Sequence, residues 1–173
     1  ELLRGTKAAT AADVLFLPSG HLNIPAGIRT LSNGLFHEEA EKTLEANGYH
    51  SGFYFTPSVR NDSLYAMKDA KSPQSSSTFQ GLTNAVSLFI EIRGIGLGRA
   101  CFARRAECGF LVSRSLLETA ALHSKEVRSE IRKAIKETYS GKSDISVTFQ
   151  SARTEFPVTF IDLTKSERFT ESL

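Results

Sequence analysis

Residues 85–99, AVSLFIEIRGIGLGR, decide how the rest of the chain is interpreted. Residues 85–93 are almost continuously apolar, β-branched or aromatic, which predicts a central strand covered on both faces. Strand alternation places Glu91 and Arg93 on one face of that strand. A carboxylate in so apolar a strand must be protonated, paired or hydrated. Glu91 is therefore either an ion-pair partner of Arg93 that seats the strand, or a carboxylate held near the strand end to handle protons.

A strand-helix-strand unit precedes this segment. Residues 13–17, DVLFL, predict a buried strand that stops at Pro18, and residues 53–55 lie in an aromatic run that predicts a second, parallel strand. Between them, apolar residues recur every three or four positions, which predicts a helix over residues 26–46. The residues of this stripe are Ile28, Leu31, Leu35, Phe36, Ala40 and Leu44.

The remaining segments complete a predicted α/β fold. Residues 58–80 show no period and predict a long irregular connection, whereas residues 100–122 and 125–139 predict two helices. The tail alternates over residues 145–149 and 156–160, as a β-hairpin or an appended edge does. We expect a mixed, mostly parallel sheet flanked by helices with a C-terminal β-hairpin, and a boundary between residues 1–140 and an appended tail over residues 141–173.

Composition narrows the function classes. The 173 residues are 40% hydrophobic and 23% charged, and the formal charge is only +2. These values fit one soluble domain with a weak long-range field, so we expect neither nucleic acid nor a membrane as a partner. Cys101 and Cys108 lie about 10.5 Å apart on one predicted helix, too far for a disulfide.

The sequence also contains candidate residues for two other kinds of site, a nucleotide site and a metal site. The glycines of GIGLG suggest a phosphate loop, but the dinucleotide fingerprint needs a further glycine where Arg99 stands. We therefore expect these glycines to allow tight turns and close backbone approach, and Arg99, Arg104 and Arg105 to form a solvated basic helix start.

The four histidines do not predict a metal site by themselves. His37 and Glu41 are four apart on a predicted helix, but two ligands do not make a zinc site, and we expect His37 on an exposed polar face. His21 follows a strand, so it is either a functional loop residue or a turn residue. No histidine lies beside either cysteine, which favours inert buried thiols.

The segment GLTNAVSLFIEIRGIG, followed by RACFARR, resembles the closing part of bacterial proteins of the zinc carboxypeptidase family, the carboxypeptidase A-like metallopeptidases. The resemblance covers roughly residues 10–140 and rests on the Glu-x-Arg pair at Glu91 and Arg93. It implies that Glu91 is the general base for hydrolysis of a peptide or acylated amino acid with a free C-terminal carboxylate. It also implies that Arg93, and Tyr65 in the loop before the strand, contact the substrate.

The chain departs from that family at the metal. The family's His-x-x-Glu zinc pair matches only His123 and Glu126, which come after Glu91 instead of before it, so we treat that match as chance. We expect the zinc ligands in an N-terminal half that precedes this chain, and we expect that half or a second copy as partner. Bacterial members of that family are often exported, which favours a periplasmic or secreted location. The unpaired thiols favour a reducing compartment instead. The alternative is a non-catalytic α/β binding module in which Glu91 and Arg93 are structural.

Overall fold

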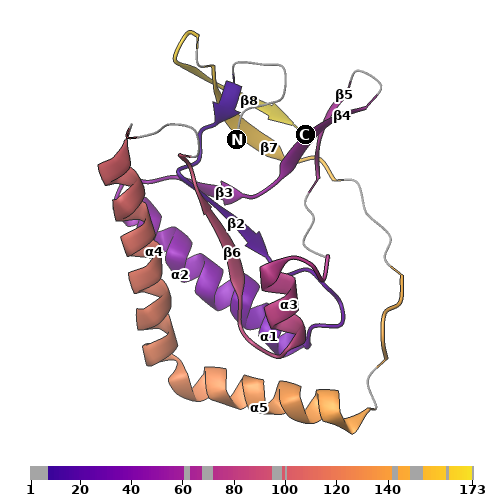
Figure 1. Cartoon of the computed structure of the whole chain (residues 1–173). Helices are drawn as coiled ribbons and strands as arrows, with labels where there is room; N and C mark the ends of the chain where they lie inside the picture. The colour runs from indigo at the N-terminus through magenta and orange to yellow at the C-terminus, as the bar shows by residue number, and fades with distance from the viewer. Residues whose placement is uncertain are drawn as a thin grey trace.

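The computed structural model describes residues 8–60, 63–67, 72–94, 99, 101–141, 144–148, 154–162 and 164–172. Figure 1 shows the order of helices and strands along the chain. The strands are β1 (Ala8–Thr10), β2 (Val14–Pro18), β3 (Ser51–Phe53), β4 (Thr56–Arg60), β5 (Ser63–Met67), β6 (Leu88–Ile92), β7 (Pro157–Asp162) and β8 (Glu167–Ser172). The helices are α1 (Ala26–Thr30), η1 (Leu31–Phe36), α2 (His37–Ala46), α3 (Ser76–Leu82), α4 (Phe102–Leu122) and α5 (Ser124–Ser140).

The sheet that carries Glu91 has the strand order β3-β2-β6. β2 runs parallel to β3 and antiparallel to β6, so this sheet is mixed and the predicted α/β class is confirmed. Within the described part of the chain, β6 lies at the edge of the sheet, and all five of its residues are half-buried. The prediction of a central strand covered on both faces is therefore wrong. Sheet position depends on which strands pair with it, and an apolar run alone does not specify that.

The predicted helix over residues 26–46 is confirmed, as α1, η1 and α2 follow one another without a break. Its middle section, η1, is a wide π-helical turn rather than a regular α-helical one. The helix ends at Asn47 and Gly48, and Gly48 takes a φ of +77°, a conformation that glycine adopts without strain.

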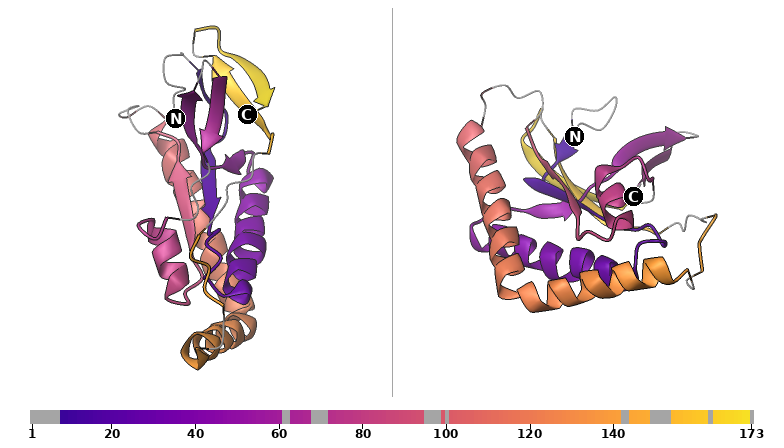
Figure 2. Two further views of the ribbon diagram at one scale, coloured as in Figure 1. Left: turned by 90° about the vertical axis from the view of Figure 1, so that its right-hand side faces the viewer. Right: turned by 60° about the horizontal axis from the view of Figure 1, so that its bottom comes forward.

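The main hydrophobic core lies on one face of the β3-β2-β6 sheet. Val14 and Phe16 of β2 are completely buried there, and Ile90 and Ile92 of β6 pack against the same cluster. Helices α2 and α4 supply its other side, through Ala40, Leu44, Cys108 and Val112. Figure 2 shows α2 on one side of the sheet and α3 on the other. One face is thus covered by two long helices, and the other only in part by a short one.

The segment predicted to be an irregular connection is partly regular. β4 and β5 pair as an antiparallel hairpin, and α3 follows them. The prediction for residues 58–80 is therefore wrong in both places. A two-stranded hairpin is held by backbone hydrogen bonds, so it leaves no clear hydrophobic period in the sequence.

The C-terminal hairpin is confirmed, but it lies further along the chain than the alternation indicated. It consists of β7 and β8, and β7 also pairs with β1. Residues 145–148 form no strand, and Phe149 lies outside the described residues. Phe55, Val158 and Phe160 form a second, smaller core beneath this sheet.

The two predicted C-terminal helices are confirmed as α4 and α5. Gly141 ends α5 in the left-handed conformation, with a φ of +62°. Ala134 of α5 packs on Ile24 and Ile28 near the start of the long N-terminal helix. In the described residues, none of the helices combines the length and the apolar character that crossing a bilayer requires.

Candidate functional site

Glu91 lies on the sheet face that α2 and α4 leave uncovered. Its neighbours Ile90 and Ile92 point into the helix-covered core, so strand alternation directs Glu91 to the opposite face. On β2 its register partner is Leu15. The residue is half-buried, so part of its surface is accessible to solvent.

The strand around Glu91 is fixed on the same face. The Phe89 ring meets the Tyr54 ring edge-on, with 5.1 Å between the centroids. At the start of β6, the Ser87 hydroxyl donates to the Ser77 carbonyl of α3 over 2.7 Å. These contacts hold the backbone that carries Glu91.

Arg93 forms its observed ion pair with Asp13, a residue that was not predicted to belong to a site. The Arg93 Nη2 lies 3.3 Å from the Asp13 Oδ1, and the Arg104 Nη1 lies 2.8 Å from the same oxygen. The other carboxylate oxygen of Asp13 accepts the His50 N–H over 3.0 Å. Asp13 is buried, and the cue available in the sequence was an acidic residue directly before an apolar strand.

These contacts join the end of β6 to the start of β2. The Arg93 N–H donates to the Asp13 carbonyl over 3.0 Å, and its guanidinium donates to the Thr10 carbonyl over 3.3 Å. Burial lowers the pKa of Arg93, and the nearby Arg104 charge lowers it further, whereas Asp13 raises it. The contacts described for Arg93 are structural, and its role toward a substrate stays a prediction.

We expected the basic helix start to be solvated, but two of its arginines make contacts within the protein. Arg104 pairs with the buried Asp13, and Arg105 donates to the Gly94 carbonyl over 3.2 Å. A Cβ at Gly94 would collide with the Arg105 side chain, and Gly94 has a φ of +154°. This close approach of a side chain to the backbone of Gly94 agrees with the role expected for the glycines of GIGLG. Residues 95–98 of the GIGLG turn lie outside the described residues.

A cleft of about 480 Å³ lies between the Glu91-bearing sheet and the C-terminal sheet. Its apolar walls include Leu15, Phe55 and Phe156, and its polar lining includes Glu41, His50 and Arg168. Leu15 is the register partner of Glu91, but Glu91 is not one of the described residues that line the cleft.

His37 is buried, so the prediction of an exposed polar position is wrong. Its ring lies edge-on to Phe16, with 4.9 Å between the centroids, and 5.7 Å from the Phe53 ring. Ser51 donates to Glu41 over 2.7 Å. His37 and Glu41 thus take part in separate packing and hydrogen-bond contacts.

The other histidines also have local roles. The His21 Nδ1 accepts the Asn23 N–H over 3.2 Å, as a turn residue does. His123 and Glu126 contact each other over 3.1 Å at the start of α5. Over the described ranges no group of three or more His, Cys, Asp or Glu side chains converges on one point, so this part of the chain does not fit a zinc site.

The positions of Tyr65 and of the two cysteines agree only in part with the predictions. Tyr65 lies in strand β5 opposite Ser58 rather than in an irregular loop, and its side chain lies outside the described residues. Cys101 and Cys108 are both free thiols, as their spacing predicted. Cys108 is buried, whereas Cys101 is exposed, so the expectation of two buried thiols holds for one of them.

The chain is similar over most of its length to proteins named as carboxypeptidases. It is 33% identical over 92% of its residues to a probable carboxypeptidase 2 of Arthroderma benhamiae. It is 31% identical over 92% of its residues to carboxypeptidase 2 of Trichophyton rubrum, and 33% identical over 82% to carboxypeptidase 2 of Trichophyton equinum. No family model matches the chain. No solved structure matches it either.

The similarity covers only a part of those proteins. The chain spans 30% of the Arthroderma benhamiae and Trichophyton rubrum relatives and 26% of the Trichophyton equinum relative.

Proposed function

We propose that this chain forms part of a carboxypeptidase-like hydrolase that cleaves a C-terminal peptide or amide bond. The observation that carries the proposal is the identity of about a third to proteins named carboxypeptidase 2 over 92% of the chain. Because the chain spans 30% of those relatives, the activity is proposed for the longer protein that contains it, not for these 173 residues alone.

Glu91 is the proposed general base. It is a half-buried carboxylate on the sheet face without long helices, held between Phe89 and Arg93, whose contacts fix β6. An ionised carboxylate in that position can accept a proton from an attacking water and then deliver it to the departing amine. Arg93 and Tyr65 are the proposed substrate contacts, where the substrate offers a free carboxylate.

We further propose that the hydrolase depends on zinc, with ligands supplied from outside this chain. When bound, zinc polarises the scissile carbonyl and lowers the pKa of water. The described side chains offer no cluster that would hold the ion. What this chain contributes in the proposal is a fixed carboxylate beside the reaction, and no metal ligand.

Among the strands that the structure describes, β6 lies at an edge of its sheet, which supports a complementary segment as partner. β6 reads LFIEI, in which Glu91 is the single charged residue and no proline is present, so β6 has few of the features that commonly protect an exposed edge. A strand from another part of the longer protein would satisfy the outer backbone groups of β6 and bring its own side chains beside Glu91.

The proposal is tested with Glu91→Gln in the complete protein. Loss of a general base costs about 10²- to 10⁴-fold in rate, so we expect hydrolysis of a blocked dipeptide to fall by that factor while bound zinc, measured by atomic absorption, stays at the wild-type level. Glu118→Gln is the matched control, because Glu118 is an exposed carboxylate in an ion pair with Arg114. Wild-type turnover by Glu91→Gln would remove Glu91 from the chemistry.

A non-catalytic binding module remains the second candidate, and one observation favours it. Arg93 is engaged by Asp13 and the Thr10 carbonyl, so the Glu-x-Arg strand already has a structural use. This candidate predicts that the complete protein neither binds zinc nor hydrolyses a blocked dipeptide, and that Glu91→Gln changes only its stability.

A further inference from the structure

Helix α4 carries an exposed apolar stripe on the side opposite its buried face. The residues of this α4 stripe are Phe102, Ala106, Phe110, Ser113, Leu117 and Ala121. Its three large members are 67%, 62% and 72% exposed, in the order Phe102, Phe110 and Leu117. The buried residues of α4 are Cys108, Leu111, Val112, Ser115 and Thr119.

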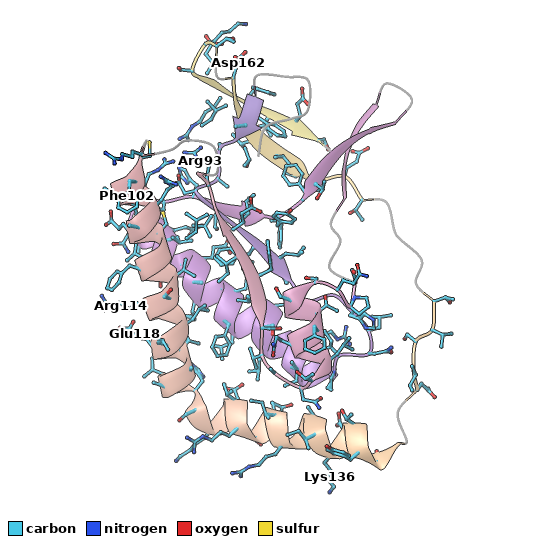
Figure 3. All side chains as sticks on the ribbon, viewed as in Figure 1. Arg93, Phe102, Arg114, Glu118, Lys136 and Asp162 are labelled. Atoms are coloured by element: carbon cyan, nitrogen blue, oxygen red, sulfur yellow. The ribbon has the colours of Figure 1, made fainter. Side chains whose placement is uncertain are left out.

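The stripe follows one helical face along the whole of α4. Its members are separated by four, four, three, four and four residues, which keeps them within about 100° around the helix. In Figure 1 α4 runs along one margin of the molecule, and Figure 3 shows Phe102, Arg114 and Glu118 on its outer side. An isolated exposed leucine needs no explanation, but a full-length apolar helix face usually marks a contact surface.

The order of large and small residues identifies the occupant. The stripe is symmetric about the midpoint between Leu111 and Val112, and each symmetry-related pair joins a large residue to a small one. The pairs are Phe110 with Ser113, Leu117 with Ala106, and Phe102 with Ala121.

We propose that the α4 stripe binds the same stripe of a second copy of this chain, with the two helices antiparallel. A two-fold axis through the midpoint would place each large side chain over a small one of the other copy, in three layers on either side of the axis. Packing of large against small lets two helix surfaces interdigitate without voids. A segment of unrelated sequence could cover an apolar face too, but it would not require the face to match itself.

The charged flank of the stripe suits the same arrangement. In the antiparallel register, Glu107 of the second copy lies level with residue 116 of the first. It is therefore displaced from Arg114 by two residues, or about 3 Å along the helix axis. Arg114 already pairs with Glu118 of its own chain over 2.8 Å, and the Glu107 carboxylate accepts the Tyr49 hydroxyl. Each copy would thus offer one cation to the acidic group of the other, twice across the axis.

The size of the stripe sets the expected strength. Aromatic side chains bury about 150–250 Å² each, so two phenylalanines and one leucine per copy give a total on the order of 1,000 Å² over both copies. This lies below the roughly 1,200–2,000 Å² of stable interfaces, so we expect a dimer with a dissociation constant in the micromolar range.

The test measures self-association of the complete protein by sedimentation velocity over a concentration series. Phe110→Asp should raise the dimer dissociation constant more than about tenfold, because it removes a central anchor from both copies. Phe79→Asp is the matched control, since Phe79 is 56% exposed on α3 and lies outside the stripe. It should leave the dissociation constant unchanged, and circular dichroism checks that both variants remain folded.

A swap tests the register separately. Ser113→Phe should place two large rings in one layer and weaken the dimer, whereas Phe110→Ser combined with Ser113→Phe exchanges large and small and should restore it. A protein that stays monomeric at about 100 µM overturns the proposal, whether the rest of the polypeptide covers the stripe or leaves it exposed. Failure of the swap to restore association overturns the antiparallel register.

The test of dimerisation can fail or succeed independently of the test of hydrolysis. Glu91→Gln should dimerise as the wild type does, and Phe110→Asp should leave hydrolysis per chain unchanged, because the stripe faces away from the sheet that carries Glu91.

Discussion

Replacing Asp13 by asparagine should destabilise the protein more than any exposed charge substitution. The Asp13 side chain is only 8% exposed, yet it accepts from three donors on three different segments. They are the Arg93 guanidinium after β6, the Arg104 guanidinium of α4, and the backbone N–H of His50 before β3. An amide of the same shape removes the charge and can present an N–H group to a donor.

The magnitude follows from the burial of the three groups. Removing one partner of a fully buried ion pair costs about 3–5 kcal/mol, because the other charge is left uncompensated. The Arg93 and Arg104 side chains are 20% and 33% exposed, so water compensates part of that loss. We therefore expect Asp13→Asn to lower the free energy of unfolding by about 2–3 kcal/mol. For a chain of this size, that corresponds to a Tm lower by about 5–10 °C.

The measurement is urea and thermal denaturation followed by circular dichroism. Asp144→Asn is the control, because Asp144 is exposed and should change stability by less than about 0.5 kcal/mol. Combining Asp13→Asn with Arg104→Met should cost less than the sum of the two single changes, since the second change removes a charge that the first leaves unpaired. A loss below about 1 kcal/mol for Asp13→Asn would show that the network contributes little, and the reasoning about β6 would fail with it.

Two predictions concern titrating groups. Cys101 is exposed, whereas burial raises the pKa of Cys108, so at pH 8 iodoacetamide should label Cys101 and spare Cys108 until urea unfolds the chain; equal labelling of both would contradict the packing of α4. The hydrogen bond to Glu107 raises the pKa of Tyr49 to about 12. This hydrogen bond therefore contributes fully to stability at a pH below about 10, the pKa of tyrosine in the unfolded chain, and its contribution is lost as the pH rises through 12. In ultraviolet difference titration, Glu107→Gln should bring that step down toward 10, and an unchanged titration curve would show that the hydrogen bond is absent.

Much of the fold could be predicted because several elements have strong local signals. The helix over residues 26–46 has an apolar stripe, Pro25 at its start and Gly48 at its end, and α4 and α5 are long and periodic. These signals depend on neighbouring residues only. The edge position of β6 could not be predicted, because it depends on which distant strands pair with an apolar run.

The error at His37 has a specific physical cause. The prediction rested on the polar HEE sequence at residues 37–39, which is typical of a solvated helix face. His37 lies three residues before Ala40 and seven before Leu44, both of which are buried, so the helical period places it on the buried face of α2. Its ring contacts Phe16 and Phe53 there, so the position on the helix outweighs the polarity of the neighbouring residues.

The Asp13 network was missed because its members are far apart in the sequence. Arg93 lies 80 residues from Asp13, and the one ion pair considered for Arg93 from the local sequence was with Glu91, the nearest carboxylate on its own face. Local alternation shows which residues share a face, but it does not show which strand lies alongside. Antiparallel pairing of β2 with β6 brings Asp13 next to Arg93, so a sequence argument needed that register first.

That register bears directly on the role proposed for Glu91. The ion pair of Arg93 with Asp13 does not involve Glu91, so Glu91→Gln leaves that pair in place and tests proton transfer separately from the seating of β6. Phe89 and Arg93, on either side of it, fix the backbone through Tyr54 and Asp13. A carboxylate on a strand that its neighbours fix is suited to the proton transfer proposed for Glu91, because a general base must be held within hydrogen-bond reach of the proton that it removes.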